Sequence, residues 1–368
     1  MKELLFSLLR YALCDGEAVD KNKIEENLAG IYILAKKHDL GQAVSYAAEK
    51  LGIKSQTLAK EKALAMLRVE KLKFATLEAS SVLEKAKIPH ILLKGANIRH
   101  LYPEEWIRTS CDIDIYVDKK HSEAAAAALV SEGYENKGYT AQDINLWAPN
   151  GCHIELHFVL VNKNRLEKAY PILSSVFEYS TKITEYKYEM NDEMLYFYHL
   201  CHIAKHLTRT GLGIRPFLDL WLMRNRLPQN KKRKELCEKG GLLKFEEVSC
   251  DLCDVWFSAK EHSPLTGQYE KYILSSNAYG THSTFSAATR SKSKNKFIHV
   301  TKRIFMPYSE LKNKYPALRG KPLLYPYYTV KRWTTLTKSD VSKRVKEELS
   351  TSKEEINAID ELFKNLQI

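Results

Sequence analysis

Apolar residues in the first 86 positions recur at the spacing expected for one face of an α-helix. A first helix is expected within the opening residues, a second fits Lys23–His38, and a third runs from near Ser55 to about Lys87. The apolar stripe of this third helix comprises Leu64, Leu67, Leu72, Ala75, Leu77 and Leu83. The pattern therefore predicts an all-helical region over residues 1–86.

From residue 87 the pattern changes to the short apolar runs that are typical of β-strands. Cys111–Val117 alternates with period two, and the turn residues at 148–151 predict a hairpin between Ile144–Trp147 and Cys152–Leu160. The other elements expected here are a buried strand at Ile88–Lys94, a short helix at Ala96–Tyr102 and a helix at Lys120–Glu132.

Beyond about Glu193 the helical spacing returns, with expected helices at Asp192–Thr208, Pro216–Leu227 and Ser339–Leu366. The fold class that follows is α+β, with a small mixed β-sheet core flanked by N- and C-terminal helical regions. We expect the boundaries of these regions at residues 1–86, 87–190 and 191–368.

The composition of the 368-residue chain changes this picture in two ways. Its net charge of +12 favours anionic partners such as nucleotides, phosphorylated sugars or nucleic acid, with the basic excess strongest from Arg290 to Lys346. No apolar run approaches the roughly 18 residues that span a bilayer, and the first residues do not have the pattern of a secretory signal. We therefore expect a cytoplasmic protein without a membrane span.

Two carboxylates carry the first chemical signal. Asp112 and Asp114 are two apart on a predicted strand, so their side chains project from the same face. Two like charges this close are unfavourable unless a cation lies between them. Oxygen ligands of this kind suit Mg²⁺, which commonly binds substrate phosphates as well.

A second strand adds a third acidic residue. His153, Glu155 and His157 share one face of the predicted strand, while apolar residues take the other. If this strand lies beside the one that carries Asp112 and Asp114, three carboxylates can hold one or two divalent ions, as in two-metal displacement at phosphorus. An exposed antiparallel face is the alternative interpretation.

The turn after the first predicted strand is a candidate phosphate contact. Gly95 allows close approach of the backbone, and Lys94 or Asn97 can then reach a triphosphate. Arg108, just before the paired aspartates, can neutralise phosphate charge or can be an ordinary loop arginine.

A later helix carries basic residues on one face. His199, His202 and His206 recur at spacings of three and four, which places them together. This face can pack structurally, contact substrate or, with less support from the spacing, hold zinc. The further basic residues near it are Lys205, Arg209 and Arg215, and Asp219 is expected to pair with Arg215.

These motifs together resemble the DNA polymerase β-like nucleotidyltransferase superfamily, and within it a broad bacterial family of uncharacterised nucleotidyltransferases. The resemblance rests on LLKGANIRHLYP, CDIDIYV and GCHIELHFVL, and extends from about Ile88 through later helical segments at His199–Leu220 and Ile304–Trp333. Such proteins are often associated with loci for capsule and other polysaccharides.

The resemblance implies a role for each motif. Asp112 and Asp114 would be metal ligands, Glu155 the third carboxylate and a base for the acceptor hydroxyl, and Gly95 the turn glycine. The sequence departs from the superfamily at two points: Ala96 stands where a serine commonly follows the turn glycine, and the spacing from Gly95 to Asp112 is longer than usual.

We therefore expect a metal-dependent nucleotidyltransferase that uses Mg²⁺, with Mn²⁺ as the alternative ion. It would move a nucleoside monophosphate from a nucleoside triphosphate to a small-molecule or protein acceptor. Nucleic acid is less expected, since the basic C-terminal part carries no aromatic RNA-binding motif. The residues expected to contact substrate are His153, His157, His202, Lys205, His206 and Arg215.

Two other functions fit the same residues. The missing serine favours an inert module that binds a nucleotide without turning it over. A metal-dependent phosphohydrolase could instead use His153, Glu155 and His157 beside the aspartates.

Overall fold

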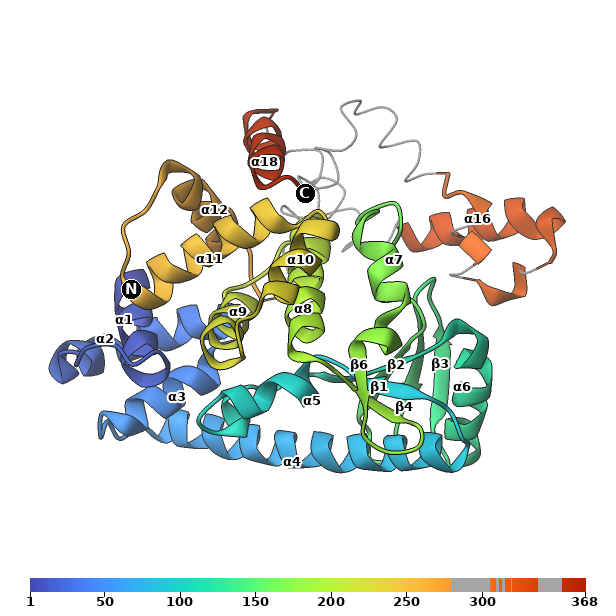
Figure 1. The fold of residues 1–368 in the computed structure, drawn as a ribbon, viewed down its shortest axis with the longest axis horizontal. Coiled ribbons are helices and arrows are strands. Elements are labelled where there is room, and N and C mark those ends of the chain that lie inside the picture. The colour runs from blue at the N-terminus through green and yellow to red at the C-terminus, as the bar shows by residue number, and fades with distance from the viewer. Residues whose placement is uncertain (279–304, 309–310, 313–314, 319, 337–352) are drawn as a thin grey trace.

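The computed structural model describes residues 1–278, 305–308, 311–312, 315–318, 320–336 and 353–368. A cluster of helices occupies one end and a mixed β-sheet the other, and the long helix α4 runs beneath both (Figure 1). In the described part of the chain, no helix combines the length and the apolar character needed to cross a membrane.

Four helices precede the sheet, and two of them begin at a residue whose side chain caps the helix. The Asp20 carboxylate accepts from the backbone of Asn22 and Lys23, and the Ser55 hydroxyl accepts from Leu58. The four helices are α1 (Lys2–Leu13), α2 (Lys21–Lys37), α3 (Gly41–Lys50) and α4 (Gln56–Lys85). The sequence did not predict α3, which is ten residues long and begins at Gly41, directly after the polar residues that were expected to end the preceding helix.

Seven strands form one mixed sheet, in the order β3-β4-β5-β2-β1-β7-β6. β2 pairs in parallel with β5, and β1 with β7, while the remaining pairs are antiparallel. The strands are β1 (His90–Leu92), β2 (Asp112–Val117), β3 (Glu135–Tyr139), β4 (Asp143–Trp147), β5 (His153–His157), β6 (Ser180–Lys182) and β7 (Lys187–Met190). The predicted hairpin is confirmed as β4 and β5, and the α+β fold class is confirmed.

Short helices fill the connections of the sheet. The helices between the strands are α5 (Gly95–Ile98), η1 (Arg99–Leu101), η2 (Glu105–Ile107), η3 (Lys119–His121), α6 (Ser122–Ser131), α7 (Ala169–Ser174) and η4 (Val176–Tyr179). The helices predicted at 96–102 and 120–132 are thus present, each divided into a 3₁₀ turn and an α-helical part.

Helices return after the sheet. They are α8 (Asp192–Leu207), α9 (Arg215–Arg226), α10 (Lys231–Lys239), α11 (Leu243–Ser258), α12 (Pro264–Ser275), η5 (Pro316–Leu318), η6 (Pro322–Leu324), α16 (Tyr325–Leu336) and α18 (Lys353–Leu366). The final helix begins at Lys353 among the described residues, and the part predicted over 339–352 lies outside them. Most of the basic stretch from Arg290 to Lys346 also lies outside the described residues.

Two hydrophobic clusters form the core. The larger one joins the N-terminal helices to the helices after the sheet, and Phe6 of α1 stacks on Trp256 of α11 with ring centroids 5.1 Å apart. The smaller one lies between the sheet and helices α4 and α6, and includes Leu72, Ile113 and Ile154. The predicted region boundaries at 86 and 190 stay a prediction.

The predicted apolar stripe of α4 is only partly correct. Leu72, Ala75 and Leu83 are buried, as expected. The other three members of the stripe are exposed: Leu64, Leu67 and Leu77. The stripe is therefore wider than the face of the helix that the rest of the chain covers.

Candidate active site

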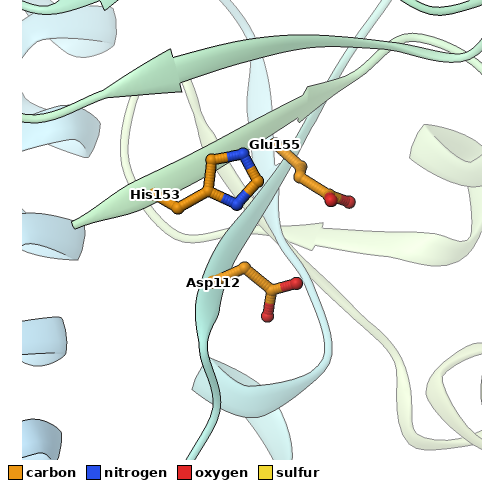
Figure 2. A group of neighbouring side chains, drawn as sticks. All are labelled: Asp112, His153 and Glu155. Carbon is orange, nitrogen blue, oxygen red and sulfur yellow. The ribbon is translucent and has the colours of Figure 1, made fainter. Parts of the chain in front are cut away.

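Parallel pairing of β2 with β5 builds the centre of the site. The register aligns Asp112 with His153, Asp114 with Glu155, and Tyr116 with His157. Because side chains alternate along a strand, the acidic residues of both strands project from one face of the sheet, and their apolar neighbours pack on the other. Figure 2 shows Asp112, His153 and Glu155 lying together on these two strands.

Two cationic side chains neutralise the central carboxylate. Lys94 Nζ lies 2.6 Å from Asp114 Oδ1, and His157 Nε2 lies 2.7 Å from the same oxygen. Burial by itself would raise the pKa of Asp114, but Lys94 and His157 outweigh this effect and hold the pKa below its usual value. Asp114 is therefore an ionised carboxylate, although it is only 5% exposed.

The His157 ring links carboxylates from three strands. Its Nε2 also lies 3.3 Å from Glu155 Oε2, and its Nδ1 lies 3.9 Å from Asp143 Oδ2. Burial would lower the pKa of His157, but the hydrogen bonds to Asp114 and Glu155 reverse this effect and raise it. The same contact with His157 lowers the pKa of Glu155. Carboxylates only accept hydrogen bonds, so Nε2 carries a proton in this arrangement.

The pKa of Asp112 is shifted in the opposite direction to that of Asp114. Burial raises its pKa, and the neighbouring charge of Asp114 raises it further. The ionised form of Asp112 therefore needs an additional cation to stabilise it. A site with this property fits a divalent metal ion.

The donor atoms also fit a metal in their placement. Two groups of three residues each offer one ligand atom, and within each group these atoms lie within 4.8 Å of one another. The groups are Asp112 with His153 and Glu155, and Asp114 with Glu155 and His157. Glu155 belongs to both groups, so it connects them.

The turn after β1 is tight around Gly95, where a side chain would displace two arginine guanidinium groups. A Cβ at Gly95 would lie 2.9 Å from Nη1 of Arg108 and 3.2 Å from Nη2 of Arg99. Asn97, which the sequence suggested as a nucleotide contact, donates from its amide to the backbone carbonyl of Leu92 at 2.6 Å. This bond holds the turn, and contact of Asn97 with nucleotide stays a prediction.

Arg108 forms the back wall of the site with a partner that the sequence did not suggest. Its Nη2 lies 3.0 Å from Asp219 Oδ2, and both side chains are almost fully buried. The Tyr102 hydroxyl donates to the same carboxylate at 2.7 Å. The expected pairing of Asp219 with Arg215 is wrong, because Arg215 instead pairs with Asp39. Asp39 lies between α2 and α3, far from Arg215 in the sequence.

Helix α8 faces the carboxylates across a pocket of about 430 Å³. His202, Lys205 and His206 line this pocket, as do Arg108 and Arg215. His199 also borders it, but its Nε2 donates to the carbonyl of Pro216 at 2.8 Å. The helical spacing therefore predicted the basic face of the pocket correctly, while its contact with substrate stays a prediction.

Burial lowers the pKa values of the basic groups of α8, so the histidines are neutral at neutral pH while Lys205 stays mostly charged. It lowers the pKa of Lys205 to about 8, with the charge of Lys94 as the next cause, and lowers the pKa of His206 to about 3. The rings of His202 and His206 lie 4.3 Å apart, and burial also lowers the pKa of His202. An anion that entered the pocket would favour the charged form of each group.

Sequence reasoning missed Asp143, which lines the pocket from the first residue of β4. Asp143 pairs in register with His157, and its Oδ1 accepts from the amide of Asn145 at 3.0 Å. The predicted hairpin held the necessary signal, because Asp143 immediately precedes the strand expected at Ile144–Trp147. Extending that hairpin by one residue pair brings Asp143 opposite His157.

The chain matches the family model described as "Uncharacterised nucleotidyltransferase" over residues 25–258, which is well over half of its length. The chain belongs to this nucleotidyltransferase family. Comparisons with curated proteins and with solved structures gave no match.

Family membership changes the expected extent of the resemblance. The match begins inside α2, so the N-terminal helices from residue 25 belong to the family region as well as the sheet. It ends with α11, and the expected resemblance at Ile304–Trp333 lies beyond it. Membership supports nucleotidyl transfer as the type of reaction, and a nucleoside triphosphate as the substrate.

Removal of the Asp219 carboxylate should strongly destabilise this nucleotidyltransferase. Asp219→Ala leaves the Arg108 guanidinium buried without an opposite charge, so we expect a loss of about 3–5 kcal/mol in the free energy of unfolding in urea. The triple variant Tyr102→Phe, Arg108→Met, Asp219→Leu should recover most of that loss, because it also removes the hydroxyl that donates to Asp219.

The matched control is Asp251→Ala, which breaks an exposed pair with Lys260 and should change stability by less than about 1 kcal/mol. If Asp219→Ala is no more destabilising than this control, the buried pair does not hold the wall of the site.

Proposed function

We propose that the protein transfers a nucleoside monophosphate from a nucleoside triphosphate to a hydroxyl or phosphate acceptor. The observation that carries the proposal is the parallel register that places Glu155 beside Asp114 on one sheet face, opposite a basic helix. Family membership supports the same reaction.

Asp112, Asp114 and Glu155 would hold the divalent ion. Carboxylate oxygens suit Mg²⁺, and the nearby nitrogens of His153 and His157 make Mn²⁺ a second fitting ion. The bound ion would supply positive charge that stabilises the phosphoryl oxygens during transfer.

The residues on the opposite wall would bind the triphosphate. Lys205 and the paired rings of His202 and His206 face the carboxylates across the pocket, so the phosphates would lie between the two walls. Lys94, whose Nζ already contacts Asp114, lies where it can exchange part of this contact for a phosphate oxygen. Binding of this kind is positioning combined with electrostatic stabilisation.

Glu155 would also accept the proton of the acceptor hydroxyl. His157 lowers the pKa of Glu155, so its carboxylate is ionised at neutral pH and can accept a proton at the oxygen that His157 does not contact. The acceptor oxygen would form a bond to the α-phosphorus while the bond to the β-phosphate oxygen breaks, and pyrophosphate would leave. Asp143 would hold His157 in place from the other side.

One observation favours an inert nucleotide-binding module as a second candidate. Lys94 and His157 both contact the same Asp114 oxygen, so this oxygen already has two cationic neighbours before any metal binds. The absence of a hydroxyl at Ala96 points the same way. The two histidines within the ligand groups also keep the phosphohydrolase in consideration. The acceptor, the polysaccharide context and the cytoplasmic location stay predictions.

Loss of the paired carboxylates should abolish turnover without unfolding the protein. We expect Asp112→Asn with Asp114→Asn to lower pyrophosphate release from a panel of nucleoside triphosphates and acceptors more than about a hundredfold. The matched control is Asp118→Asn, on the same stretch of chain but outside this pocket, and it should retain wild-type turnover.

Nucleotide binding without any pyrophosphate release by the wild-type protein would instead support the inert module. Release of inorganic phosphate alone would support the phosphohydrolase. Unchanged turnover in the double variant would contradict the metal assignment.

The affinity for nucleotide should fall on the alkaline side of neutrality. Burial lowers the pKa of Lys205 to about 8, so its ammonium group is present below this pH and is lost as the pH rises through it. We expect the KM for nucleoside triphosphate to increase several-fold between about pH 7 and pH 9.

Lys205→Arg keeps its charge over this range, so its KM should change little with pH. An alkaline increase of the same size in wild type and Lys205→Arg would show that another group is responsible.

A further inference from the structure

The segment that contains η6 and α16 presents apolar side chains to solvent. Leu323 is 94% exposed, Tyr327 is 61% and Val330 is 54% exposed, and we call these three residues the α16 face. Thr329 and Arg332, on the opposite side of α16, are buried. A surface helix of a globular protein ordinarily has the reverse arrangement, with its apolar side against the core and its polar side in water. The α16 face therefore lacks the apolar surroundings that its side chains favour.

The inward side of α16 is already packed by residues that precede the helix. The ring centroids of Trp333 and Phe305 lie 5.6 Å apart. The Tyr325 hydroxyl donates to the backbone carbonyl of Met306 at 2.8 Å. A rotation of α16 that turned its apolar side inward would break these contacts, so the α16 face is directed outward by the fold itself.

The chain around the α16 face is strongly basic. Between Glu310 and Asp340 the sequence has seven lysines and arginines and no acidic residue, which is more than half of the net charge of +12. Lys321 and Lys331, which flank the face in the sequence, are both exposed. A second copy of the chain would bring like charges together at this surface. The complementary partner is therefore an anionic one.

We propose that the α16 face docks on a membrane surface that carries anionic lipids. Leu323, Tyr327 and Val330 would enter the boundary between the head groups and the acyl chains, while Lys321 and Lys331 would contact the lipid phosphates. Apolar residues flanked by lysines are typical of helices that lie in this boundary. Helix α16 has 12 residues, so it would lie along the membrane surface and not cross it.

The kind of apolar side chain favours lipid over nucleic acid, the other common polyanion. Proteins that bind single-stranded nucleic acid use exposed aromatic rings on which the bases stack. Leu323 and Val330 are aliphatic and cannot stack on a base in this way. Their transfer from water to the acyl boundary is favourable, because it removes apolar surface from water.

The position of α16 in the fold is compatible with membrane docking. The helix lies at the periphery of the molecule, at the opposite end from the N-terminal helices (Figure 1). No residue of η6 or α16 lines the pocket around the carboxylates. The family match also ends before this segment, at residue 258. Docking through α16 therefore leaves the pocket open and does not depend on the proposed reaction.

Cosedimentation of the full-length protein with lipid vesicles tests the proposal. We expect the wild type to bind vesicles of phosphatidylcholine mixed with phosphatidylglycerol, and to bind vesicles of phosphatidylcholine alone much more weakly. Binding to the mixed vesicles should decrease as the salt concentration rises. A wild type that binds neither kind of vesicle, or that binds single-stranded RNA but not the vesicles, would overturn the proposal.

Two pairs of substitutions separate the apolar contribution from the charge. Leu323→Gln with Val330→Gln leaves the net charge unchanged and should weaken binding to the mixed vesicles at least about tenfold. Lys321→Gln with Lys331→Gln should weaken it about tenfold through the loss of two charges near the surface. All four side chains are exposed, so thermal unfolding of both variants should match wild type.

The matched control is Ile33→Gln, because Ile33 is an aliphatic residue that is 71% exposed on α2. This variant should bind the mixed vesicles like wild type. Unchanged binding in Leu323→Gln with Val330→Gln would overturn the docking of the α16 face. Unchanged binding in Lys321→Gln with Lys331→Gln would overturn the contact of these lysines with the lipid phosphates.

Discussion

Parallel pairing between β2 and β5 is the constraint on which the rest of this structure depends. Because both strands alternate apolar and polar residues, the pairing register determines which side chains lie on each of the two faces of the sheet. It sends Ile113 and Ile154 into the core beneath the sheet and brings Asp114 level with Glu155 above it. A shift by one residue would bury the carboxylates and expose the core.

The concentration of acidic groups on one sheet face explains the basic groups around it. Lys94 comes from the turn after β1, His157 from β5, and Lys205 from α8, so three separate elements supply positive charge to one pocket. Arg108 does not add to this charge, because Asp219 neutralises it within the wall. The net arrangement leaves Asp112 as the carboxylate whose charge still needs a cation.

Local patterns predicted the elements that combine an apolar face with a polar one. The alternation at Cys111–Val117 gave β2, and the turn signal at 148–151 gave the hairpin that became β4 and β5. Strands β3, β6 and β7 escaped prediction, because they are short and mostly polar and lie toward the edges of the sheet. Helix α3 was also not predicted, because it is short and begins at Gly41, directly after the polar residues that end the helix before it.

Contacts between distant segments could not be predicted from spacing. Arg108 and Asp219 are 111 residues apart, and only the packing of α9 against the loop before β2 brings them together. The sequence did indicate which residue types would surround the carboxylates. It did not indicate which basic residues would be neutralised by other partners and which would remain to meet a substrate.

Binding of Mn²⁺, followed by the paramagnetic resonance of the free ion, tests the central claim most directly. The account predicts that the wild-type protein binds Mn²⁺ and that Glu155→Gln weakens this binding at least about tenfold, because Glu155 connects both ligand groups. The exposed Glu189→Gln on β7 serves as the control and should bind like wild type. Equal affinity in Glu155→Gln and wild type would contradict the claim that β2 and β5 together form a metal site.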